Sequence, residues 1–132
     1  MAQVNVYKLG VSATTPAANM TSVSLPRKGT IKQIAMVASC SIETDTVGKV
    51  QVALNRPNAQ FASAVNTPCN VLAELHIVAL LTTSGISNAT NSIVVPCNQP
   101  VVEKDVLYLN GVATSGGVNG LEADVLIFVE ET

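Results

Sequence analysis

Three cysteines and the single histidine of this 132-residue chain are the side chains that could bind zinc together. The cysteines are Cys40, Cys69 and Cys97, spaced 29 and 28 residues apart, and the histidine is His76. Structural zinc sites bring their ligands in close pairs such as C-x2-C, because a short turn presets half of the tetrahedron. The spacing therefore argues against a metal site. We interpret the cysteines as reduced, small and apolar core residues.

A disulfide between Cys69 and Cys97 is the alternative for two of these thiols. Both follow a proline at the expected end of a strand. The odd number of cysteines opposes the bond, as does a start, MAQVNVYKLG, without the charged and apolar regions of a secretory signal. The sequence leaves the pairing open.

Nucleophilic catalysis is not predicted either. A serine or cysteine nucleophile needs a base and an orienting partner, and the only histidine lies in the apolar segment Leu75–Leu80, where we expect it partly buried or at an interface. A cupin-like oxygenase would need several histidines on converging strands. We therefore predict no catalytic residues and no cofactor, and we expect that the protein is not an enzyme.

Acidic residues occur as three pairs at positions i and i+2, where they share one face of a strand. Glu43/Asp45 and Glu103/Asp105 fall in expected turns, whereas Glu122/Asp124 marks the solvated side of the last strand. General acid–base catalysis needs two carboxyl groups in different environments across a cleft, which this pattern does not provide. A calcium site at one of the loop pairs stays open.

The chain carries few charged residues, and this limits the classes of partner that it can bind. Charged residues make up 12% of the sequence, against about 25% in ordinary soluble domains, and none occurs from Leu75 to Val102. The seven basic residues are scattered, so we expect no binding to nucleic acid. The apolar runs are too short to span a bilayer, so we expect no membrane association. A poorly charged surface points instead to assembly with other proteins.

Alternating apolar and polar residues predict a succession of strands that would position these side chains. In the first, Val4 and Val6 alternate with Gln3, Asn5 and Tyr7. In Thr30–Ile42 one face carries the apolar residues from Ile34 to Ile42, and Ile31, Ala35 and Val37 lie on the other. Further strands are expected at residues 22–25, 49–54, 61–65, 92–95, 105–112 and 121–129, with a hairpin joining 30–42 to 49–54 and a glycine-rich turn at 114–120.

Val71–Leu81 can be read as an amphipathic helix or as a strand. We favour the strand, because every surrounding segment has the period of a sheet. Eight or nine strands in one domain, residues 1–132, predict an all-β antiparallel β-sandwich of jelly-roll type.

The segment Ser92–Glu131 resembles the closing strands of small jelly-roll proteins found on tailed-bacteriophage virions. The likeness lies in a turn at Val102–Asp105 that opens a strand, a Gly/Ser loop, and a last Val/Ile/Phe strand that ends in acidic residues. It covers about 40 residues, and its motifs also fit a lectin or another viral jelly roll. The resemblance implies a capsid decoration or cement protein, and it transfers no site residue.

The expected function is accordingly structural. The protein would be made in the host cytoplasm and would act on the capsid surface of the virion, as a trimer or other homo-oligomer bound to the major capsid protein at subunit junctions. A tail or receptor-binding tip protein is the alternative, and a carbohydrate-binding module is a third reading that four aromatic residues support poorly.

Two segments are the expected contact elements. Residues 11–19 form a loop or extended arm, with Val11, Thr14 and Pro16 as contacts, and we expect removal of residues 1–19 to lower particle binding without unfolding the sandwich. Residues 82–91 form an uncharged loop, with Ile86, Asn88 and Ala89 as contacts.

Charged substitutions at Ile86 or Ala89 should therefore impair assembly more than folding, since a charge in a contact loop is solvated until a partner covers it. Oligomeric mass and thermal unfolding of the same variants separate the two effects. Unchanged assembly would count against the loop as a contact.

Overall fold

The computed structural model describes residues 3–13, 20–43, 48–55, 70–77, 86–113 and 118–132. These residues form eight strands: β1 (Gln3–Ala13), β2 (Thr21–Ser24), β3 (Gly29–Glu43), β4 (Gly48–Asn55), β5 (Asn70–Ile77), β6 (Ile86–Val101), β7 (Val106–Ala113) and β8 (Val118–Glu131). Among the described residues, no helix is long and apolar enough to cross a membrane.

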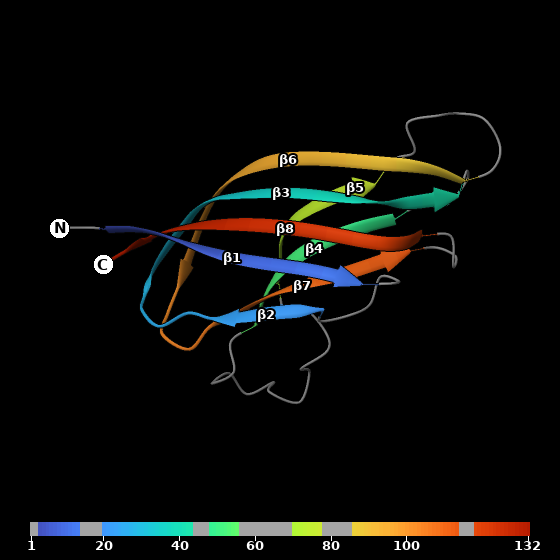
Figure 1. Cartoon of the computed structure of the whole chain (residues 1–132). Coiled ribbons are helices and arrows are strands. Elements are labelled where there is room, and N and C mark those ends of the chain that lie inside the picture. Colours follow the sequence, from blue (N-terminus) through green and yellow to red (C-terminus); the bar gives the residue numbers. More distant parts are fainter. Residues whose placement is uncertain (1–2, 14–19, 44–47, 56–69, 78–85, 114–117) are drawn as a thin grey trace.

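The strands form two antiparallel sheets that lie face to face (Figure 1). Sheet A has the order β1-β8-β3-β6, and sheet B has the order β2-β7-β4-β5. β1 pairs with β8, β2 with β7, β3 with β6, and β4 with β5, so the numbers of each pair sum to nine. A ribbon of four such pairs rolled into two sheets is a jelly roll, which confirms the predicted fold class.

The core lies between the sheets and consists of aliphatic side chains from alternate positions. β8 contributes Leu121, Val125, Ile127 and Val129, all fully buried, while Glu122 and Asp124 between them are exposed. The predicted inward set of β3, from Ile34 to Ile42, is buried as well. Period two was therefore sufficient to assign the core face of the long central strands.

The prediction was wrong for Ile31, which is fully buried rather than on the outer face of β3. The register of β3 shifts between Ile31 and Gln33 against both of its neighbours. A β-bulge inserts one extra residue into a strand and so reverses the inward and outward sets on its two sides. Ile31 and Ile34 consequently face the same core despite their odd spacing.

β1 is longer than the predicted short strand, and it includes Val11–Ala13 of the expected arm. Tyr7 and Leu9 face the core, and Leu9 is fully buried. The valines Val4 and Val6 lie on the outer face of sheet A. Because β1 supplies core residues and a full ladder to β8, removing residues 1–19 would open the sandwich, contrary to our expectation from the sequence.

β6 is also longer than expected and replaces part of the predicted loop 82–91. Its 16 residues start at Ile86, and all of them except the bulge region pair with β3. The strand continues through Pro96 and Pro100, although proline was expected to end it. Proline is tolerated on an edge strand, where its missing N–H can point away from the ladder, and β6 is an edge of sheet A.

Sequential neighbours do not form the predicted hairpin. β3 lies in sheet A and β4 in sheet B, so the chain crosses between sheets where we expected a turn within one. The same holds for β7 and β8. The period of a strand identifies its faces and carries no information about its partner, which explains the error.

Three other expectations hold. β5 confirms the strand interpretation of Val71–Leu81 as far as Ile77, with Leu75 and Ile77 buried, while residues 78–81 lie outside the described residues. β4 buries Val50 and Val52 as predicted. The turn after β6 closes through Asp105, whose Oδ2 accepts a hydrogen bond from the Val102 N–H at 2.9 Å. The predicted strand 61–65 and most of the glycine-rich turn lie outside the described residues.

Gly29 offers a sharp test of this packing. A Cβ at Gly29 would overlap the backbone oxygen of Glu130 and lie 3.0 Å from the Cα of Glu131, neither of which can move without shifting β8. We expect Gly29→Ala to lower the free energy of unfolding by at least about 2 kcal/mol, as overpacking does. Urea unfolding followed by circular dichroism measures the change.

Gly10→Ala is the matched control on the same sheet. Its Cβ would meet the Asp124 carboxylate at 3.0 Å and Lys8 Cε at 3.7 Å, both of which belong to exposed side chains that can shift. We expect a change within about 0.5 kcal/mol, typical of surface substitutions. Equal losses for the two variants would refute the described approach of β3 and β8.

Candidate functional site

The outer face of sheet A is the most distinctive surface of the described residues. Two rows of side chains cross it from β1 to β6 through β8 and β3, as the strand registers define. One row is Val6, Phe128, Gln33 and Pro96, and the next is Lys8, Leu126, Ala35 and Val94. Apolar side chains thus extend across all four strands.

Many of these side chains are well exposed to solvent. The exposed fraction is 57% for Val4, 51% for Val6 and 59% for Val94, and it is 40% for Val37 near the centre of the sheet. A strand surface that is only solvated normally carries polar residues at such positions. Adjacent exposed aliphatic side chains on several strands indicate a surface that another molecule covers.

Charged groups also lie on this face, since Lys8 belongs to the second row and Asp124 is the neighbour of Val37 on β8. Lys8 Nζ lies 3.7 Å from Asp124 Oδ1, and both side chains are more than half exposed, so the pair adds little stability. Lys32 Nζ lies 3.5 Å from Asn98 Oδ1 at the bulge. The acidic pair predicted on the solvated side of the last strand, Glu122 and Asp124, is exposed at the far end of β8.

The outer face of sheet B has a different, polar character. Glu74 on β5 accepts a hydrogen bond from Gln51 Nε2 at 2.6 Å and lies 3.4 Å from Lys49 Nζ, both on the neighbouring β4. The hydrogen bond from Gln51, helped by the charge of Lys49, lowers the pKa of the Glu74 carboxyl. His76 Nε2 lies 2.8 Å from Glu74 Oε1. This cross-strand network stabilises the β4–β5 pairing.

His76 itself is on the surface, with 60% of its side chain exposed. His76 is therefore not partly buried within the domain, because it lies on the outer face of β5 between the buried Leu75 and Ile77, and its place at an interface stays a prediction. Cys40 is a free, buried thiol whose pKa is raised by burial, and Cys97 is free and half-buried. Cys69 lies outside the described residues, which contain no cluster of three or more potential metal ligands.

A second polar cluster joins the first and last strands at one end of the sandwich. Glu131, the last residue of β8, points inward and accepts hydrogen bonds from the Asn5 amide and the Tyr7 hydroxyl of β1. Burial, followed by the hydrogen bond to Glu131 and its charge, raises the pKa of Tyr7 to about 12, against the opposing charge of Arg27. The cluster closes the end of the sheet A ladder.

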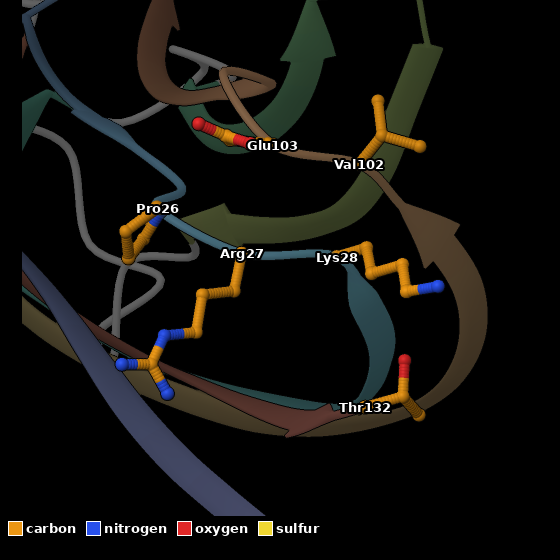
Figure 2. Close-up of a pocket in the computed structure, with 6 residues that line it drawn as sticks. All are labelled: Pro26, Arg27, Lys28, Val102, Glu103 and Thr132. Atoms are coloured by element: carbon orange, nitrogen blue, oxygen red, sulfur yellow. The ribbon is translucent and has the colours of Figure 1, made fainter.

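An open hollow of about 460 Å³ lies beside this cluster, and Figure 2 shows its lining. Arg27 and Lys28 come from the turn after β2, and Val102 and Glu103 come from the turn after β6. Figure 2 shows Arg27 and Lys28 pointing to different sides and Glu103 pointing away from both. The charged groups therefore do not converge on a common point where a substrate could react.

The residues predicted as contacts are not brought together by the described structure. Val11 lies in β1, half-buried and packed against the core. Ile86, Asn88 and Ala89 lie in β6, opposite Glu43, Ser41 and Cys40 of β3. Thr14 and Pro16 fall outside the described residues. The contact role of all six stays a prediction.

The outer face of sheet A was missed by sequence reasoning, although its signal was present. Ala35 and Val37 make β3 apolar on both faces, and Leu126 and Phe128 do the same for β8. A strand that is apolar on both faces is covered on both faces, in the domain or by a partner. What the sequence could not show is that β1, β8, β3 and β6 are neighbours and place these residues on one surface.

Comparisons with known proteins give no family for this chain, since no family model and no curated protein matches it. Similar solved structures include the capsid of Ralstonia phage GP4, at 17% identity and a TM-score of 0.49, covering 98% of this chain and 86% of that chain. The capsid of Helicobacter pylori bacteriophage KHP30 has 10% identity and a TM-score of 0.48, with coverages of 98% and 93%.

A likeness to a different class of protein is of the same strength. The globular domain of zebrafish complement 1qA has 12% identity and a TM-score of 0.46, and 96% of each chain is covered. The three TM-scores thus lie between 0.46 and 0.49, for two phage capsids and for the complement 1qA domain. These likenesses carry no conclusion about function, which has to come from the surface and the sequence.

The Tyr7–Glu131 contact predicts a dependence of stability on alkaline pH. Replacing Tyr7 by Phe removes one donor from the buried Glu131 carboxyl and should cost about 1–2 kcal/mol of unfolding free energy at neutral pH. Because the pKa of Tyr7 is raised in the fold from 10.0 to about 12, its contribution is complete below pH 10 and is lost as the pH rises through about 12.

Denaturant unfolding of the native protein and Tyr7→Phe across this range measures the difference. Groups common to both proteins cancel in the comparison. A difference that stays constant up to pH 12 would contradict the described hydrogen bond.

Proposed function

We propose that this protein is a non-enzymatic structural component of a virion, a capsid decoration or cement protein that forms a homo-oligomer and binds the outer shell at subunit junctions. The observation that carries the proposal is the exposed apolar surface across the outer face of sheet A. It is a broad, pleated surface suited to another protein surface rather than to a small ligand.

Burying apolar surface is worth about 25 cal/mol per Å², and a soluble chain that leaves several aliphatic side chains side by side in water is prone to association. In this chain 48% of residues are hydrophobic and 12% are charged, so few charges are available to keep such a surface solvated. A partner that covers the face accounts for its retention.

The polar groups of the described residues have structural roles that support the same proposal. Glu74 links β4 to β5, Glu131 links β8 to β1, and Asp105 closes the turn after β6. Each of them stabilises the sandwich. Most of the exposed large aliphatic side chains of the described residues, by contrast, lie on sheet A, and Val71 and Val102 are the two that do not.

We propose a virion location and the major capsid protein as partner because residues 92–131 resemble the closing strands of phage jelly-roll proteins. In the structure this segment comprises most of β6, the turn at Val102–Asp105, β7 and β8. β6 and β8 supply Val94 and Leu126 of the apolar face. The segment that carries the resemblance therefore also provides half of the strands of the proposed contact surface.

A tail or receptor-binding tip protein remains the alternative, and binding of glycans would distinguish it. Sugar sites stack aromatic rings on the apolar face of the sugar, which requires exposed rings. Of the aromatic residues in the described part of the chain, Tyr108 is buried, and Tyr7 and Phe128 are half-buried. These three rings therefore favour the cement role over a sugar-binding role, and specific binding on a glycan array would reverse that preference.

Binding to shells tests the proposal. We expect the purified chain to co-sediment with capsid shells that lack a decoration protein. Val37→Glu should weaken this binding at least tenfold, because it adds a second carboxylate beside Asp124 on the covered face, while the exposure of both side chains keeps the cost to folding small.

Val71→Glu is the matched control. Val71 has an exposed fraction of 44%, close to the 40% of Val37, and it belongs to β5 of sheet B. It should bind shells as the native protein does. If both variants bind normally, or if the native chain does not bind any shell, the proposed role is wrong.

A further inference from the structure

The four edges of the two sheets differ in how they are protected against pairing with another strand. β2 is only four residues long and is followed within two residues by Pro26. β5 carries Glu74 and His76 at its outward positions. β6 contains Pro96 and Pro100. Short length, charge and proline are the usual means by which proteins block an edge.

β1 is the exception among these edges. It spans 11 residues, contains no proline, and pairs on one side only, with β8, within the described residues. Its outward residues next to the open side include Val4 and Val6, which are exposed by 57% and 51%. The strand therefore combines an unpaired backbone edge with apolar side chains.

Lys8 is the only charged residue of β1, and it lies outward on the outer face of sheet A. Its Nζ lies 3.7 Å from Asp124 Oδ1 on β8, so the side chain reaches toward its own sheet. The opposite end of β1 lies beside Glu130, which is paired with Val4. A positive group on β1 and a negative group on the neighbouring β8 thus occur at two points beside the same edge.

We infer that β1 is the dimerisation strand of this protein, pairing antiparallel with β1 of a second copy across a twofold axis. The two copies of sheet A then form one continuous eight-stranded sheet. The inference specifies how the homo-oligomer of the proposed function is built: its partner is a second copy, and its contact is β1. It rests on the proposed function only for the biological purpose of the dimer. The association itself needs no shell.

Charge complementarity favours a register centred on Val6. In that register Val6 faces the partner's Val6, and Lys8 faces the partner's Val4. Because Val4 is paired with Glu130 in each copy, Lys8, the partner's Val4 and the partner's Glu130 then lie in one row across the seam. A positive and a negative charge therefore approach each other on both sides of the axis. A register that set Lys8 against the partner's Lys8 would bring like charges together, which is destabilising in a cross-strand pair.

The joined sheet also extends the apolar face. Val4 and Val6 of the two copies meet at the seam, and the rows through Leu126 and Val94 continue on both sides. A surface of eight strands doubles the area available to a shell and binds through two identical patches. Such bivalent contact strengthens binding without any new type of interaction.

The oligomeric mass of the full chain, measured by light scattering over a range of concentrations and without shells, tests the inference. We expect a dimer. Val6→Lys should raise the dimer dissociation constant at least tenfold, because two introduced ammonium groups would face each other across the axis. Val94→Lys is the matched control, with 59% exposure on the same outer face at the opposite edge, and it should remain dimeric.

The results of these measurements distinguish a dimer formed through β1 from association through the outer face of sheet A. Equal dissociation of both variants would show that copies associate through the face and not through the β1 edge. A native monomer or trimer would overturn the β1 dimer outright, while shell binding by the native chain would leave the proposed function intact. Conversely, Val37→Glu should stay dimeric even where it loses shell binding.

A second measurement covers the case in which Val6→Lys does not fold. Amide hydrogen exchange of the native chain should slow in β1 as protein concentration increases, since pairing protects the amides on the open edge. Exchange in β6, the proline-containing edge, should not change with concentration. Exchange in β1 that is independent of concentration across a monomer–dimer transition would reject the edge.

Discussion

The structure depends on β8, the strand that holds both ends of the chain in one sheet. β8 pairs along its length with β1 on one side and with β3 on the other, and its inward side chains from Leu121 to Val129 are almost completely buried. The last strand must therefore be present before the first can be fixed. Contacts between residues so distant in sequence are entropically costly to form, which makes this pairing the demanding step of the fold.

The same strand explains why the outer face of sheet A is apolar. β8 and β3 are the two central strands of the sheet, and their cross-strand neighbours lie on both sides. Leu126 lies beside Ala35 on one side and Lys8 on the other, so aliphatic contacts stabilise the ladder even on the outer face. Part of the apolar surface thus serves the pairing of strands. The strongly exposed Val4 and Val94, at the two edges, are the part that such pairing does not explain.

The sequence predicted the faces of strands better than their neighbours. Alternation assigned Ile34 to Ile42 and Leu121 to Val129 to the core, because burial against the second sheet forces that period. It failed at Ile31, where one inserted residue reverses the pattern, and at Pro96, which an edge strand accepts and a central strand would not. It could not assemble the candidate surface, because the alignment of Val6, Leu126, Val37 and Val94 depends on which strands are paired, and alternation is the same for every pairing.

The protection of the sheet edges connects the fold of this protein to its proposed association with a second copy. A jelly roll leaves open strands at the sides of its sheets, and each is a site where another chain can pair. In this protein prolines occupy β6, and polar side chains occupy β5, whereas β1 has no proline and a single outward charge, Lys8, which lies 3.7 Å from Asp124 of its own sheet. In the proposed dimer, the open edge beside exposed valines is the one that pairs, because the other edges are protected. The same arrangement would leave the rest of the outer face of sheet A to the proposed shell contact.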